Sequence, residues 1–124
     1  MEQENKELLL QDLCARLPYG VMIHLDDFPD AILMGINNGV AILDDATHDP
    51  IHNAPWNIEY IKPYLFPLSS MTDEQYKIYY ELEHSGNMEH LSLPLLEWLN
   101  KNHFDYRDLI PKGLAIDATE LNIY

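Results

Sequence analysis

The residues best suited to chemistry gather in one polar loop and on the strand end expected beside it. The string His48-Asp-Pro-Ile-His52 supplies two imidazoles and a carboxylate, and a further imidazole, His24, precedes a pair of aspartates. Imidazole and carboxylate together suit zinc or a similar divalent ion, and three such ligands with a bound water would form a hydrolytic centre. One hypothesis is therefore a metal-dependent hydrolase with the ligands His24, His48, Asp49 and His52.

Two features of this loop argue against a metal site. Histidines four positions apart share one side only on a helix, and Pro50 disfavours a helix because it cannot donate a backbone hydrogen bond. The spacing of a calcium-binding loop is also absent, since Asp44, Ala46 and His48 do not supply the required oxygens. The alternative is a solvated loop, and no cofactor is expected.

Other nucleophiles lack the setting that catalysis needs. Cys14 falls among leucines of an expected helix, where a free cysteine acts as a small buried hydrophobe. Ser69 and Ser70 have no Gly-x-Ser-x-Gly context. The sequence also lacks a glycine-rich phosphate-binding loop, because no glycine is followed by a helix with a Lys-Ser or Lys-Thr pair. The sequence therefore favours a non-enzymatic protein.

A group of aromatic residues indicates a different function, the binding of another protein. Tyr76, Tyr79 and Tyr80 have the spacing of one helix face, and such residues provide contact area at low entropic cost. Aromatics rimmed by acids would suit a proline-containing or basic peptide. The alternative is that this face packs on the sheet with Tyr64 and Phe66. The predicted partner-binding residues are Trp56, Tyr60, Tyr64, Tyr76, Tyr79 and Tyr80.

The charge of the chain disfavours direct nucleic-acid binding. Its 124 residues include 21 Asp and Glu against 7 Lys and Arg, a formal net charge of −14, and no two basic residues are adjacent. Counterion release from a phosphate backbone needs clusters of Lys and Arg. The acidic surplus favours solubility. A sharper hypothesis is that spaced carboxylates imitate phosphates and inhibit a nucleic-acid-binding protein.

Composition also limits the compartment and the number of domains. A single cysteine cannot form an internal disulfide, which favours a cytoplasmic protein. The acidic N-terminus with its short apolar run at residues 8–10 is neither a secretory nor a targeting signal, and no apolar stretch is long enough to span a membrane. We expect residues 1–124 to form a single domain, since this length supports one core.

Hydrophobic periodicity predicts a helix over residues 6–17, followed by strands. The helix places Leu9, Leu13 and Cys14 on its apolar side and Asp12 and Arg16 on the other. Residues 21–68 then read as a small sheet with strands at 21–25, 31–36, 40–43 and 56–58. The turn at 37–39 (NNG) predicts a tight hairpin. The prolines within 62–68 confine that segment to an edge strand or a covering segment.

The part of the chain from residue 72 to 124 is expected to be mainly helical. Thr72 and Gln75 have capping-box spacing and open a helix that ends near His84. Ser92 caps a third helix, and Asp105 caps a further short turn. The predicted fold is α+β: an N-terminal helix, a small curved antiparallel sheet or SH3-like barrel, then two C-terminal helices and a short terminal segment.

Four strings in the chain resemble a known group of sequences. They are residues 6–20 (KELLLQDLCARLPYG), 61–72 (IKPYLFPLSSMT), 98–110 (WLNKNHFDYRDLI) and 112–117 (KGLAID). They are similar to segments of a family of small uncharacterised proteins from Bacteroidales bacteria, their prophages and mobile elements. The likeness covers about half of the chain, mainly its N-terminus and the region after Ile58. The family has no established activity, so the resemblance implies a bacterial or phage cytoplasmic setting and no catalytic residue.

Overall fold

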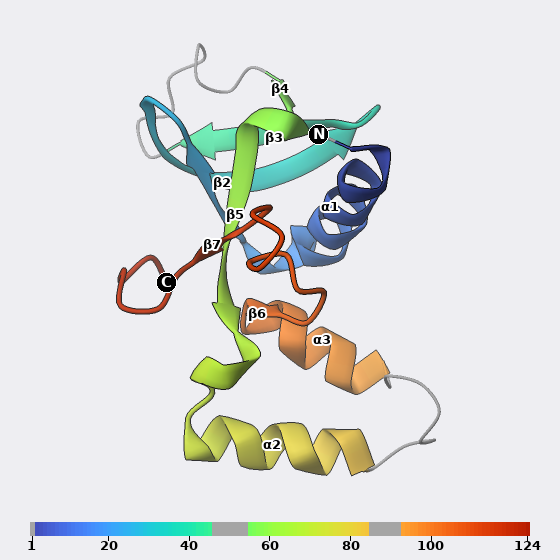
Figure 1. Ribbon diagram of the computed structural model, residues 1–124, viewed down its shortest axis with the longest axis vertical. Helices are drawn as coiled ribbons and strands as arrows, with labels where there is room; N and C mark the ends of the chain where they lie inside the picture. Colours follow the sequence, from blue (N-terminus) through green and yellow to red (C-terminus); the bar gives the residue numbers. More distant parts are fainter. Residues whose placement is uncertain (1, 46–54, 85–92) are drawn as a thin grey trace.

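The chain folds into an N-terminal helix, a curved mixed sheet and C-terminal helices, which is the α+β class that the sequence predicts (Figure 1). The computed structural model describes residues 2–45, 55–84 and 93–124. The helices are α1 (Gln3–Arg16), α2 (Asp73–His84) and α3 (Leu93–Lys101), and the short 3-10 turns are η1 (Leu17–Tyr19), η2 (Ile58–Tyr60) and η3 (Leu68–Ser70). The strands are β1 (Met22–Leu25), β2 (Phe28–Asn37), β3 (Val40–Asp45), β4 (Trp56–Asn57), β5 (Ile61–Pro67), β6 (Phe104–Asp105) and β7 (Ile116–Asp117).

The tight hairpin predicted at residues 37–39 is confirmed. β2 and β3 pair antiparallel on either side of the turn, beginning with Asn37 opposite Val40. Asn38 and Gly39 have φ angles of 52° and 79°. A two-residue hairpin turn of this kind requires positive φ at both central positions, which Asn and Gly adopt most readily.

A second tight turn makes β2 longer than the sequence predicts. Asp26 and Asp27 connect β1 to β2, and Asp27 has a φ of 64°. Leu25 pairs with Phe28 directly across this turn, so the strand begins there instead of at residue 31. Pro29 is exposed near the start of β2.

The sheet is mixed and open, which corrects the expectation of an antiparallel sheet or barrel. Its strand order is β4-β3-β2-β1-β5-β6, with β7 also paired to β5. β6 and β7 run parallel to β5, because the C-terminal segment passes alongside that strand in the same direction. Across the described residues β4 and β6 do not pair with each other, so the strand order does not close on itself.

β5 lies inside the sheet, and the prediction that it forms an edge or covering segment is wrong. It runs along most of the length of the molecule (Figure 1). Its first three residues pair with β1, residues 64–65 pair with β7, and residues 66–67 pair with β6. The prolines are tolerated because each one falls where a ladder ends: Pro63 is the last residue paired with β1, and Pro67 is the last residue of β5.

The buried side of α1 also differs from the predicted one. Leu9 and Leu13 are buried as expected, but Asp12 and Arg16 are fully buried beside them, while Cys14 is exposed. Charged residues can occupy this position because the Arg16 guanidinium donates two hydrogen bonds to the Asp12 carboxylate, at 2.8 and 3.1 Å. The predicted helix is confirmed, with Leu9 and Leu13 on its buried side, whereas the predictions that Cys14 is buried and that Asp12 and Arg16 face away are wrong.

Two hydrophobic clusters hold the elements together. The larger one lies between α1 and the sheet, and it extends to Leu109 and Leu114 in the segment after β6. The smaller one joins α3 to β6 through Leu95, Leu99 and Phe104, and α2 contributes only partly buried side chains to it. β5 contributes to both clusters and connects them.

The predicted helix caps are confirmed where the structure describes them. The backbone N–H of Gln75 donates to the Thr72 hydroxyl at 3.1 Å, and the Thr72 N–H donates to the Gln75 side chain at 2.9 Å. The Asp105 carboxylate accepts from the N–H groups of Leu109 and Ile110 at 2.9 and 2.8 Å. The expected cap Ser92 lies outside the described residues.

Candidate functional site

The six aromatic residues predicted to form one binding region lie in three separate places. Trp56 and Tyr60 lie on β4 and η2, where the Trp56 ring meets Phe28 edge-on. Tyr64 is buried in β5. The other three lie on α2, which occupies the opposite end of the molecule from β4 (Figure 1). They are Tyr76, Tyr79 and Tyr80.

These three residues lie within five positions of one another on α2, and we call them the tyrosine stripe. The rings of Tyr76 and Tyr79 stack with centroids 6.3 Å apart, and the Tyr80 ring stacks on His84 at 4.0 Å. Tyr76 is 60% exposed and Tyr80 is 53% exposed. The helical spacing therefore predicts their arrangement correctly, and two of the three rings face outward.

Tyr79 fixes the stripe to the rest of the molecule. Its ring packs at the edge of the α3 cluster together with Phe66, as the packing alternative expects for one of the three tyrosines. Burial raises the pKa of the Tyr79 hydroxyl, and the nearby Glu83 carboxylate raises it further. The Tyr79 hydroxyl therefore keeps its proton at neutral pH and can donate a hydrogen bond.

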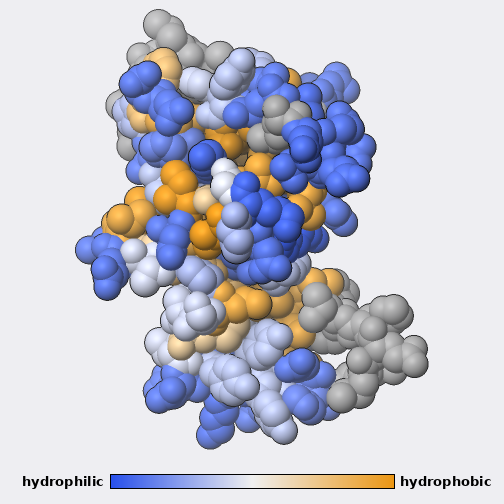
Figure 2. All heavy atoms as spheres, in the orientation of Figure 1, coloured by the Kyte–Doolittle hydropathy of each residue, from blue (hydrophilic) through white to orange (hydrophobic). Residues whose placement is uncertain are grey.

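The rest of α2 is mainly acidic, although Ile78 is also exposed. It has the carboxylates of Asp73, Glu74, Glu81 and Glu83 against the single lysine Lys77. In Figure 2 the orange apolar atoms gather across the middle of the molecule, whereas the end formed by α2 is pale to blue. The stripe thus offers aromatic rings bordered by negative charge.

The predicted metal ligand His24 takes part in a hydrogen-bonded cluster. Its Nε2 lies 3.1 Å from the Asp26 carboxylate, and its Nδ1 lies 3.1 Å from the Tyr64 hydroxyl. That hydroxyl donates to Asp30 at 2.8 Å. Burial and the hydrogen bond to Asp30 raise the pKa of Tyr64 to about 12. Both ring nitrogens of His24 are engaged by side chains that link β1, β2 and β5.

The other three predicted ligands, His48, Asp49 and His52, lie outside the described residues. Within residues 2–45, 55–84 and 93–124, no group of three or more His, Cys, Asp or Glu side chains is arranged to hold a metal ion. The metal-dependent hydrolase therefore stays a prediction of the sequence.

The structure also contains a buried charged network that sequence reasoning missed. Asp12 accepts hydrogen bonds from Arg16 and from Arg107, which is 2.9 Å away, and Arg16 also donates to the carbonyl of Phe104 at 2.6 Å. Both guanidinium groups lie over the Tyr106 ring. The spacing of Asp12 and Arg16 is a detectable signal for an ion pair. It gives no indication that the pair is buried or that Arg107 completes it.

Comparison with known proteins does not assign a family. No protein-family model matches the chain, and no curated protein or solved structure is significantly similar to it. In the part of the chain that the structure describes, no helix has the length and apolar character needed to cross a bilayer. Function is therefore inferred from the geometry of the residues themselves.

Proposed function

We propose that the chain is a non-enzymatic protein-interaction module that binds a basic segment of a partner protein through the tyrosine stripe of α2. The observation that supports this most directly is that α2 buries none of its 12 residues. A surface helix of a globular protein normally buries an apolar side. Here, large side chains that include Tyr76, Ile78 and Tyr80 remain exposed.

The chemistry of the stripe supports a partner that carries arginine or lysine. Exposed tyrosine rings attract guanidinium and ammonium groups through their π faces, and tyrosine is enriched at protein interfaces. The carboxylates of α2 would attract the same cationic groups over a longer range and speed association. A partner with one or two arginines beside apolar or proline residues would match both features.

We also propose a bacterial or phage cytoplasmic setting. The resemblance of residues 61–72 and 98–110 to proteins of Bacteroidales bacteria and their mobile elements supports this source. The single cysteine is compatible with a reducing compartment.

The test compares capture of partners from a Bacteroidales lysate by the full chain and by two variants. The variant Tyr76→Ala with Tyr80→Ala removes both exposed rings of the stripe. The variant Tyr60→Ala is the control, since it removes a tyrosine that is at least as exposed and lies at the other end of the molecule. We expect a partner that is retained by the native chain and by the control and is lost by the double variant.

Binding of that partner, once purified, gives the quantitative result. Loss of an interface hot spot costs about 2 kcal/mol or more, or roughly a 30-fold weaker affinity for the double variant. Association should also slow as salt is added. Identical capture by all three proteins would refute the proposal. A partner that binds nucleic acid would favour the phosphate-mimicking inhibitor instead.

A further inference from the structure

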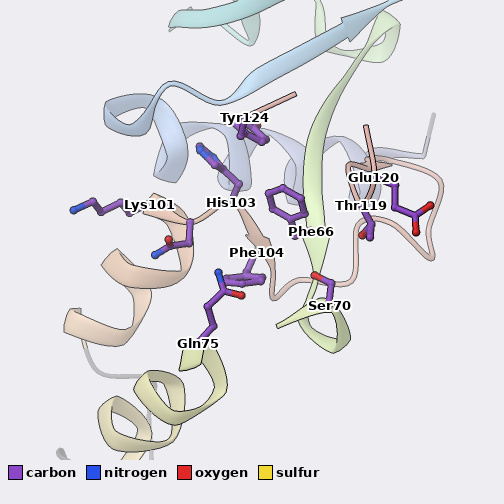
Figure 3. Close-up of a pocket in the computed structure, with 10 residues that line it drawn as sticks. Phe66, Ser70, Gln75, Lys101, His103, Phe104, Thr119, Glu120 and Tyr124 are labelled. Carbon is purple, nitrogen blue, oxygen red and sulfur yellow. The ribbon is translucent and has the colours of Figure 1, made fainter. Parts of the chain in front are cut away.

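A second candidate site lies beside the first turn of α2, where β5, the end of α3 and the C-terminal segment meet. It is a cavity of about 320 Å³, within the range of small-molecule sites. Three segments far apart in the sequence converge on it. The aromatic rings and Gln75 gather at its centre, whereas Lys101 and Glu120 extend away from it (Figure 3). The residues around it are Phe66, Ser70, Gln75, Lys101, Asn102, His103, Phe104, Thr119, Glu120 and Tyr124.

The aromatic wall of this cavity is held in place before any ligand binds. The Tyr124 ring stacks on His103 with centroids 3.7 Å apart and planes 11° apart, and it meets Phe66 at 5.8 Å. The Tyr124 hydroxyl donates to the carbonyl of Tyr64 and accepts from the N–H of Met22. A wall fixed by such bonds binds a flat ligand without the cost of ordering its own side chains.

Three polar groups of the cavity are also oriented, and each keeps a donor or acceptor capacity that no described residue uses. The Gln75 side-chain oxygen accepts from Thr72, which leaves its amide N–H groups free to donate. The Ser70 hydroxyl donates to the carbonyl of Pro67, which leaves its oxygen able to accept. The Asn102 amide nitrogen donates to the carbonyl of Trp98, which leaves its oxygen able to accept. The cavity thus offers fixed neutral donors and acceptors beside aromatic rings.

The interior of the cavity carries no net charge. Lys101 and Glu120 lie on opposite sides of it, with the phenylalanines between them (Figure 3). Neither forms an ion pair with a described residue, and their charges are opposite. Burial and the nearby Arg16 guanidinium lower the pKa of His103 to about 4, so its ring is neutral at pH 7. The net charge of −14 disfavours a phosphorylated ligand.

We propose that this cavity binds a neutral nitrogen heterocycle of the nucleobase or nucleoside class. A flat ring would stack against the aromatic wall, and its donors and acceptors would pair with Gln75, Ser70 and Asn102. Such rings combine a π face with a hydrogen-bonding edge, which are the two features that the cavity complements. The cavity adjoins the tyrosine stripe, since Gln75 belongs to α2 and Phe66 packs in the same cluster as Tyr79, but none of the three stripe tyrosines lines it.

The test is a titration of the full chain with adenosine, guanosine, cytidine and uridine, each followed in ¹H–¹⁵N correlation spectra. Adenosine 5′-monophosphate and toluene serve as probes that add a charge or lack a hydrogen-bonding edge. We expect at least one nucleoside to shift the resonances of Phe66, Gln75, His103 and Tyr124. The monophosphate and toluene should bind more weakly than that nucleoside. Trp98, which stacks on Phe104 at 5.5 Å, provides a fluorescence readout of the same event.

Two variants separate stacking from hydrogen bonding. Phe66→Leu keeps an apolar side chain on β5 but removes the ring, and it should weaken nucleoside binding at least about 5-fold. Gln75→Glu keeps the oxygen that caps α2, so the helix start is retained, but it removes the free amide donors. We expect it to weaken binding by up to about 10-fold. Tyr60→Ala should leave binding unchanged.

Three results would overturn the proposal. One is that no nucleoside shifts the cavity resonances at millimolar concentration. Another is that toluene binds as well as the best nucleoside, because the hydrogen-bonding groups of the cavity would then contribute nothing to affinity. The third is unchanged affinity in both Phe66→Leu and Gln75→Glu. Loss of partner capture by the tyrosine-stripe variant has no bearing on any of these outcomes.

Discussion

Among the histidines that the structure describes, His103 is the one most strongly desolvated. Its ring lies against Tyr124, and its Nδ1 is buried without a hydrogen-bond partner among the described residues. Its backbone has a φ of 63°, in the left-handed region where Asn, Asp and His are the residues most enriched after glycine. The fold therefore holds His103 in a position that favours its neutral form.

This position makes stability depend on pH in a defined direction. Folding lowers the pKa of His103 from its ordinary value of 6.5 to about 4. Below pH 6.5 the unfolded chain binds a proton that the folded chain does not bind, so this stabilisation is complete above pH 6.5 and is lost as the pH falls towards 4. Thermal unfolding of the native chain and of His103→Asn across this range checks the effect.

We expect the melting temperature of His103→Asn to fall less steeply with decreasing pH than that of the native chain. Asparagine does not titrate and adopts positive φ readily, so the variant isolates the contribution of the imidazole. Parallel curves for the two proteins would show that His103 is protonated equally in the folded and unfolded chains.

The helices differ in how firmly they are attached. α1 buries Leu9 and Leu13 together with the ion pair of Asp12 and Arg16. By contrast, α2 has no buried residue and is held by its capping box and by the partly buried side chains of Tyr79 and Leu82. Helical stability in proteins comes mainly from packing. α2 should therefore open at lower free energy than α1 does.

The prediction for α2 concerns hydrogen exchange. Amides of α2 should exchange faster than those of α1, and Thr72→Ala should accelerate α2 further because it removes a cap worth about 1 kcal/mol. Exchange in α1 should not change. Ser69→Ala, a substitution at an exposed neighbour, is the control. Equal slowing or equal acceleration of both helices would contradict a separately opening α2.

Elements that depend on local signals could be predicted from the sequence. Asn38 and Gly39 set their turn by their own φ preferences, and Thr72 and Gln75 cap α2 within one helical turn. The place of β5 could not be predicted in this way, because its partners include residues of β7 about 50 positions later, such as Ile116 opposite Tyr64. Strand pairing over that separation leaves no periodic trace in either segment.

The same distinction applies to the candidate sites. The tyrosine stripe follows from helical spacing, so the sequence predicts it. The stripe is separated from Trp56, Tyr60 and Tyr64 because β5 runs between the two ends of the molecule. The cavity beside the stripe depends on a tertiary contact, the stacking of His103 on Tyr124. No sequence motif indicates that His103 or Tyr124 lines a cavity.

For the molecule as a whole, Asp12 joins the N-terminal helix to the C-terminal segment. Its carboxylate is fully buried and accepts from Arg16 and Arg107, and Arg107 lies 95 positions later in the chain. Removing one member of a buried charge pair leaves its partners uncompensated in a poorly solvated place. The network therefore stabilises the fold only as a complete set.

We predict that Asp12→Ala destabilises the protein by about 3–5 kcal/mol, measured by urea unfolding. Gln11→Ala changes an exposed neighbour on the same helix and should have an effect within about 0.5 kcal/mol. A loss below about 1 kcal/mol for Asp12→Ala would mean that water reaches the two guanidinium groups in the folded protein.

The network also sets an order of events while the chain is being made. A ribosome adds about 5–20 residues per second. Arg16 finds its acceptor on Phe104 after 88 further residues, and Asp12 finds Arg107 after 95. For roughly 5–20 seconds, Asp12 and Arg16 therefore lack the C-terminal partners that they contact in the folded chain. During that interval the nascent chain depends on solvent, or on a chaperone, to accommodate these charged groups.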